Sequence, residues 1–176
     1  MIRIESILKK ISEPQTWLED RVYLLLQHHG IRTPEQIDLH QLCSTYGIEI
    51  QMINGRSRTH AHPIYPNRSI IAIDERLEAA EQRVKIAHEW GHLLLHEGIQ
   101  PQNTEWMIEW QEAQANHFAE HVLMPFYMVG PLLIGVPRYD AHHYLAQLFR
   151  VPLPLAKKRY DRFLARMHDK GFPVYM

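Results

Sequence analysis

The sequence contains a single cysteine, Cys43, which excludes an internal disulfide. A lone cysteine is typical of proteins in a reducing compartment. Long hydrophobic runs are also missing, because no stretch approaches the roughly 18 apolar residues that cross a membrane. The opening segment MIRIESILKKIS alternates charged and apolar residues, so it does not resemble a secretory signal. We therefore expect a cytoplasmic protein without a membrane partner.

An excess of charge of either sign is absent as well. Lys and Arg number 19 against 20 Asp and Glu, which gives a formal net charge of -1. The whole molecule therefore carries no strong field towards nucleic acid or acidic membranes, and any basic surface must be local. At 176 residues the chain is long enough to bury one hydrophobic core, as a single domain or as a core domain with a small extension.

Helical periodicity dominates both ends of the sequence, and β-branched runs occupy the part between them. The runs GIEIQMI and SIIAID predict two or three strands between Ile48 and Ile73. The pattern as a whole favours an α+β fold that is mostly helical and has a small sheet. The expected helices, in chain order, are a stretch to about Ile11, residues 17–29 before Gly30, a segment capped by Thr33, a long helix capped by Asp74, a second long helix from about Glu105 to Met124, and three Pro-punctuated segments at 125–136, 140–151 and 154–167.

The pentad HEWGH at residues 88–92 lies in the first of the two long expected helices. Residues four apart share one helix face, so His88 and His92 can both direct an imidazole nitrogen at one metal ion. Glu89 is displaced around the helix and can instead reach a water molecule held by the metal. Gly91 is unfavourable in a helix interior and predicts close approach of another segment. The alternative is a chance pairing, because the chain contains 13 histidines.

A third metal ligand has to come from elsewhere in the chain. His96 continues the histidine ladder, but on a straight helix it lies about 12 Å from His88 along the axis, too far to share one ion. In the second long helix, Glu112 begins an apolar, inward-facing stripe where a carboxylate needs a cationic partner such as zinc. Asn116, one turn later, can orient a ligand histidine. Glu109 is the alternative ligand, and a solvated glutamate at a helix edge is the plain structural interpretation of Glu112.

The stretches HEWGHLLLH and EAQANHFAEHVLMP, at residues 88–96 and 112–125, resemble the ImmA/IrrE family of bacterial and phage metallo-endopeptidases. The resemblance covers roughly residues 20–166. It implies a zincin-like fold in which a small sheet packs on two helices that hold Zn²⁺, the gluzincin-like arrangement. The family often has Glu directly before the Ala-Asn pair, where this chain has Gln114, and the bulky Trp90 beside the glutamate raises a question about substrate preference. The roles implied are zinc ligation by His88, His92 and Glu112, base catalysis by Glu89, and orientation of a ligand by Asn116.

The resemblance also implies an activity and a partner. Three protein ligands leave one zinc position open, as catalytic zinc sites do. The expected function is hydrolysis of a peptide bond in a helix-turn-helix transcriptional repressor, and the strand at 69–73 is a possible edge for extended substrate. The basic C-terminal side chains could dock an acidic face of that repressor. Candidates for stabilising the oxyanion are His60, His62, Tyr65 and Tyr127.

A competing interpretation comes from the C-terminal segment AHHYLAQLFRVPLPLAKKRYDRFL, which has the form of a helix-turn-helix. It suggests a DNA-binding regulator, or an adaptor that binds metal and grips a repressor without cutting it. Pro152 and Pro154 in the turn argue against DNA binding, and a solvated basic helix is the simpler explanation. We expect a zincin-like peptidase domain with N-terminal helices at residues 1–135 and a helix-turn-helix-like extension at 136–176.

Overall fold

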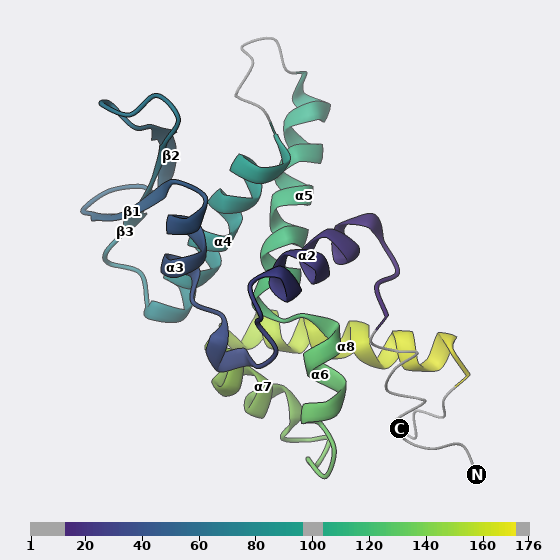
Figure 1. Ribbon diagram of the computed structural model, residues 1–176. Coiled ribbons are helices and arrows are strands. Elements are labelled where there is room, and N and C mark those ends of the chain that lie inside the picture. The colour runs from purple at the N-terminus through teal and green to yellow at the C-terminus, as the bar shows by residue number, and fades with distance from the viewer. Residues whose placement is uncertain (1–12, 97–103, 172–176) are drawn as a thin grey trace. The chain divides into compact units, whose positions relative to one another are not determined.

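The computed structural model describes residues 13–96 and 104–171 (Figure 1). Two compact units divide the chain: a sheet unit, Asp38–Ala119, and a helical unit formed by Met1–Ile37 and Glu120–Met176. The described residues confirm the α+β class, with a three-stranded sheet and mostly helical structure elsewhere. The helix expected up to Ile11 lies outside the described residues. The expected division of the chain at residue 135 stays a prediction.

The sheet contains strands β1 (Ile48–Ile53), β2 (Arg58–Ala61) and β3 (Ser69–Asp74) in the order β1-β3-β2. β1 is parallel to β3, and β2 is antiparallel to it. The strand expected as a possible edge for substrate, at 69–73, is therefore central, and that expectation is wrong. β2 pairs along the edge of β3 that β1 leaves free, and residues 70–73 of this central strand are all buried.

Two helices of the sheet unit pack against this sheet. α3 (Leu39–Thr45) is capped by Asp38, whose carboxylate accepts from two backbone N–H groups of the first turn, and it packs on β1. α4 (Ala79–Leu95) packs on β3. The expectation that Asp74 caps this helix is wrong, because Asp74 ends β3 and its carboxylate pairs with Arg76 at 2.6 Å.

Helix α5 (Glu105–Leu123) contributes residues to both units, and its end before Pro125 agrees with the sequence pattern.

In the helical unit, the segment that was expected to form a helix after Thr33 is only the 3-10 turn η1 (Pro34–Gln36). No helix among the described residues is long and apolar enough to cross a membrane. The other helices of this unit are α2 (Trp17–His28), α6 (Phe126–Leu132), α7 (Ala141–Phe149) and α8 (Leu153–Asp169).

α7 and α8 form the helix-turn-helix-like pair that the sequence predicted. The turn between them passes through Arg150, which adopts a left-handed backbone conformation with φ of 54°. The two helices pack on each other, and Leu145, Phe149 and Val151 are buried. The motif therefore forms part of a hydrophobic core in this unit.

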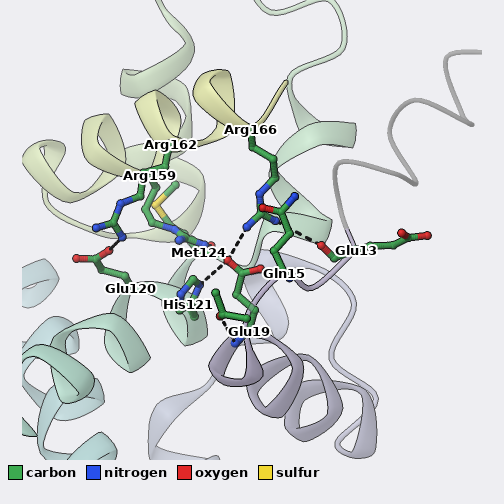
Figure 2. Close-up of polar contacts among 10 residues, drawn as sticks. Glu13, Gln15, Glu19, Glu120, His121, Met124, Arg159, Arg162 and Arg166 are labelled. Carbon is green, nitrogen blue, oxygen red and sulfur yellow. Dashed lines mark hydrogen bonds and ion pairs between the residues drawn. The ribbon is translucent and has the colours of Figure 1, made fainter. Parts of the chain in front are cut away.

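The basic side chains of α8 are largely engaged inside the helical unit (Figure 2). Lys158 and Arg162 both pair with Glu120, which is 7% exposed. Arg166 is buried and pairs with the buried Glu19 of α2 at 2.5 Å. The expectation that the basic C-terminal side chains dock an acidic partner is not supported for these three residues, because carboxylates of the same unit already neutralise their charges.

Arg159 is the most deeply buried of these cations and has a different partner. Its guanidinium donates to the backbone oxygen of Met124 at 2.6 Å and lies 3.8 Å from the centre of the Phe126 ring. Desolvation lowers the pKa of Arg159, while Glu120 and Glu19 oppose that change. Arg159 thus satisfies a carbonyl just beyond the end of α5, where Pro125 prevents the helix from continuing.

Replacing Arg166 with methionine is expected to destabilise the protein by about 3–5 kcal/mol. The substitution leaves the carboxylate of Glu19 buried without its principal cation, and removing one partner of a buried pair is costly. Lys158→Met is the control, because this side chain is half exposed and Glu120 keeps Arg162, so the loss should stay below about 1 kcal/mol. Urea unfolding followed by circular dichroism measures both. Equal losses would contradict the assignment of Arg166 as an interior ion-pair partner.

Candidate metal centre

The two histidines of the pentad lie one turn apart on the second half of α4, as the sequence predicted. Nε2 of His88 and Nε2 of His92 are separated by 3.1 Å, so both rings present the same nitrogen to one point. The side chain of His88 is 10% exposed and that of His92 is 26% exposed. The pair is therefore accessible from solvent on the His92 side.

Glu112 of α5 completes the cluster. Its carboxylate oxygens lie 3.4 Å from Nε2 of His88 and 3.2 Å from Nε2 of His92. Among the described residues, these are the three His, Cys, Asp or Glu side chains that could hold one metal ion together. Their donor atoms all lie within 4.8 Å of one another. Glu109, the alternative ligand, is exposed and does not join the set.

Asn116 orients His88 from behind. The Oδ1 atom of Asn116 lies 2.9 Å from Nδ1 of His88, a distance at which Nδ1–H donates to the amide oxygen. That tautomer leaves Nε2 with a lone pair directed at the cluster. Two imidazole nitrogens and a carboxylate oxygen are a donor set that suits zinc, so the residues present fit the metal implied by the sequence.

His96 ends α4 and does not belong to the cluster. Its Nε2 lies 3.3 Å from the backbone oxygen of Gln111, so this nitrogen donates to α5 rather than facing a metal. Burial lowers the pKa of His96 and that of His92, which favours neutral imidazole in both. His96 therefore links the end of α4 to the first half of α5, in agreement with its exclusion on distance.

Glu89 points towards the sheet, where it meets a residue that the sequence did not single out. The hydroxyl of Thr59, on β2, donates to Oε2 of Glu89 at 2.7 Å. No local signal marks Thr59, because the contact depends on β2 pairing with β3 and on α4 packing against the same sheet. The structure thus adds one polar partner to the residues expected at the site.

Trp90 faces the core of the sheet unit. Its side chain is fully buried, with the ring centre 5.4 Å from that of Phe118 and 5.8 Å from that of Tyr46. The concern that Trp90 alters substrate preference is therefore not supported, because the indole packs in the interior. Its bulk instead helps to hold α4 against α5 and α3.

Gly91 marks the place where α5 approaches α4 most closely. A Cβ atom at this position would lie 3.0 Å from Cδ1 of Phe118 and 3.2 Å from Cα of Ala115. The close approach that the glycine predicted is confirmed. It brings α5 near enough for Glu112 and Asn116 to reach the two histidines.

Gly91→Ala is expected to destabilise the sheet unit and to weaken metal binding. The new methyl group meets backbone of Ala115, so overpacking of about 1–3 kcal/mol should exceed the gain in helix propensity of about 1 kcal/mol. Gly55→Ala is the control, because its Cβ would contact only Ile53, at an ordinary 3.8 Å. Thermal unfolding of both variants tests this, and an unchanged melting temperature in Gly91→Ala would refute it.

Three of the four candidates for oxyanion stabilisation have other contacts. His62 accepts two backbone N–H groups through Nδ1, one of them from Tyr65, whose ring packs on His62. Tyr127 belongs to the helical unit and donates to the backbone oxygen of Ile31. His60 is exposed on β2 and, by strand alternation, faces away from the side that meets Glu89. None of these side chains has a described contact with the metal cluster.

Comparison with known proteins agrees with this geometry. The profile of peptidase family M78, described as the IrrE N-terminal-like domain, matches residues 43–161. Two proteins of Bacillus subtilis (strain 168) are similar over most of the chain. The phage-like element PBSX protein XkdA is 30% identical over 149 residues, 85% of this chain and 74% of its own length. The uncharacterized protein YqaB is 27% identical over 155 residues, 88% of each chain.

A solved structure shares the fold. It is described as a Mycobacterium tuberculosis transcriptional regulator, and it superposes with a TM-score of 0.61 at 17% sequence identity. The match covers 90% of this chain and 52% of that chain, so the present chain spans about half of the regulator. The likeness concerns the fold alone.

Proposed function

Since this chain belongs to peptidase family M78, we propose that it is a zinc-dependent endopeptidase whose active site is the metal cluster of the sheet unit. The observation that carries the proposal is the convergence of His88, His92 and Glu112 from two helices, beside a carboxylate on the helix face next to them. His88 and His92 would bind the ion through Nε2, and Glu112 through its carboxylate. Asn116 would hold His88 in the tautomer that ligation requires.

The chemistry follows from the position of Glu89 next to the ligands. When bound, zinc would supply a Lewis acid that lowers the pKa of a water molecule and polarises a peptide carbonyl. The carboxylate of Glu89 accepts the proton of the attacking water and later delivers it to the nitrogen of the leaving amine. Glu89 is suited to this role because it follows a ligand directly in sequence and yet is not one of the three converging donors, since its carboxylate accepts from Thr59 of β2.

The surroundings of the cluster suit a polypeptide substrate. β2 is an edge strand of the sheet, and Thr59 places it beside Glu89, so an extended peptide could pair with its outer edge close to the site. The first turns of α5 expose large apolar side chains, and surfaces of this kind often bind protein segments. Those side chains are Trp106, Met107, Ile108 and Trp110.

Within this activity, we propose a cytoplasmic helix-turn-helix repressor as the substrate, cut once to relieve repression. Support comes from the single cysteine and near-neutral charge, from the similarity to a protein of a phage-like element, and from the fold shared with a transcriptional regulator. Selectivity would come from docking, so the enzyme should be nearly inert towards generic substrates.

The test incubates zinc-loaded protein with the repressor encoded beside its gene and with unrelated folded proteins, and maps the fragments by mass spectrometry. One discrete cut confined to the repressor supports the proposal. Indiscriminate digestion would indicate a general peptidase. Binding of the repressor without any cut would indicate an adaptor and would overturn the proposed activity.

The DNA-binding alternative is less favoured by the helical unit. A recognition helix needs exposed cations, whereas Arg159 and Arg166 of α8 are buried, and Lys158 and Arg162 are paired with Glu120. The exposed positions of α8 include Lys157 but also Asp161. Specific DNA affinity that persists after complete removal of metal would favour the regulator and count against the peptidase.

A further inference from the structure

We propose that Thr59 is a positioning residue for Glu89, holding the catalytic carboxylate in the orientation that accepts a proton from water. The inference rests on the proposed peptidase function and assigns a role to a residue outside both sequence motifs. It starts from one contact, the 2.7 Å hydrogen bond from Oγ1 of Thr59 to Oε2 of Glu89, across 30 residues of sequence.

The contact joins two rigid elements. Thr59 pairs with Ile71 of the central strand β3, and α4 packs on that same strand. Threonine is β-branched, so its χ1 angle is restricted and its hydroxyl has a defined direction. The side chain of Glu89, in contrast, has several rotatable bonds, and its ordering in a single conformation costs conformational entropy. A short bond from a rigid strand reduces the number of conformations open to the carboxylate.

The bond also gives the two carboxylate oxygens of Glu89 different roles. Oε2 accepts from Thr59, which leaves Oε1 to accept the proton of the attacking water. Hydrogen bonds to a charged group are stronger than those between neutral groups, so this bond favours one orientation of the carboxylate over its alternatives. Because Thr59 lies on β2, the proposed edge for the peptide, one strand would place both the substrate backbone and the base.

The first arm of the test is kinetic and uses the full-length zinc-loaded chain with the repressor substrate. Thr59→Val keeps the shape but removes the donor, and kcat should fall about 10-fold or more while KM changes little. Thr59→Ser restores the donor and should recover most of the lost rate. Thr45→Val is the control, because that hydroxyl bonds a backbone oxygen within α3 and should leave kcat unchanged.

The second arm needs no turnover and measures binding of acetohydroxamic acid to Co²⁺-loaded protein by visible absorption. A hydroxamic acid gives up a proton when it chelates a metal, and the neighbouring base is the acceptor. Thr59→Val should therefore weaken binding several-fold when Glu89 is present and have no effect in a Glu89→Ala background. Such a difference isolates an effect that passes through Glu89.

The results distinguish a failure of the proposed peptidase function from a failure of the role assigned to Thr59. Failure of the wild-type chain to cut any repressor overturns the proposed substrate, while the hydroxamate cycle still reports on Thr59. Normal kcat in Thr59→Val, or the same loss of hydroxamate affinity with and without Glu89, overturns the positioning role. Loss of rate that Thr59→Ser does not restore would also contradict it, because the donor would then be irrelevant.

Discussion

Glu89→Gln is expected to abolish cleavage while leaving metal content and melting temperature unchanged. Glutamine keeps the shape of the side chain and an oxygen that can still accept from Thr59, so the local structure should persist. It has no carboxylate to accept a proton, and loss of general-base catalysis lowers rates by about 10²–10⁴-fold. Fragment yield by mass spectrometry, with metal content from elemental analysis of the same sample, measures both halves of the prediction.

Retention of cleavage by Glu89→Gln would exclude Glu89 as the base. Loss of metal together with activity would instead place Glu89 among the ligands, contrary to its orientation towards β2. Glu109→Gln is the matched control, because Glu109 is an exposed glutamate one turn before the cluster, and this variant should cut at the wild-type rate.

Glu112→Ala is expected to remove tight zinc binding, and His88→Ala should do the same. The wild-type chain should hold one zinc, and each substitution leaves only two of the three donors that converge on one point. The folded state should also be less sensitive to chelators in these variants, because a metal bound only by the native state stabilises it. Zinc titration monitored by a competing chromophoric chelator provides the affinities.

Glu109→Ala is again the control and should bind zinc with wild-type affinity. The assignment of the third ligand is wrong if Glu112→Ala keeps full stoichiometry and affinity while Glu109→Ala loses them. Such a result would require α5 to rotate relative to α4, against the close packing of Ala115 and Phe118 on Gly91.

The predictions that the structure confirmed depend on local periodicity. Four-residue spacing places His88 and His92 on one helix face whatever surrounds them, and the same spacing on α5 directs Glu112 and Asn116 to these histidines, although Glu112 is 52% exposed and does not face inward as its stripe predicted. Gly91 indicated a contact with another part of the chain, because glycine in a helix interior lowers the stability of the helix and close packing explains its presence. A family resemblance added the pairing of the two helices.

Most of the predictions that were wrong concern contacts between distant parts of the chain, although the ion pair of Asp74 with Arg76 is local. Asp74 looked like a helix cap, but a strand and an ion pair with Arg76 use it instead. The strand at 69–73 looked like an edge until β2 was found to pair with it. Thr59 gave no signal at all. A short polar strand such as RTHA has weak local preferences, so its place in the sheet could not be predicted from sequence.

The basic face of α8 illustrates the same point for charge. Lys158, Arg159, Arg162 and Arg166 look like an exposed cationic surface when only the helix is considered. Glu19 and Glu120, which pair with three of these cations, and the Met124 carbonyl that accepts from Arg159 are far away in sequence, so counting charge along the chain cannot reveal these contacts. Side-chain charge predicts a docking surface only once its intramolecular partners are known.

The central claim, metal-dependent hydrolysis at the cluster, is tested most directly by stripping the protein with a chelator and restoring zinc in steps. Bound metal and cleavage of the repressor are measured in the same samples. The account predicts that both rise together and level off at one zinc per chain, and that Glu89→Gln takes up the metal without cutting. Cleavage by metal-free protein, or full zinc occupancy without any cut in the wild-type chain, would contradict it.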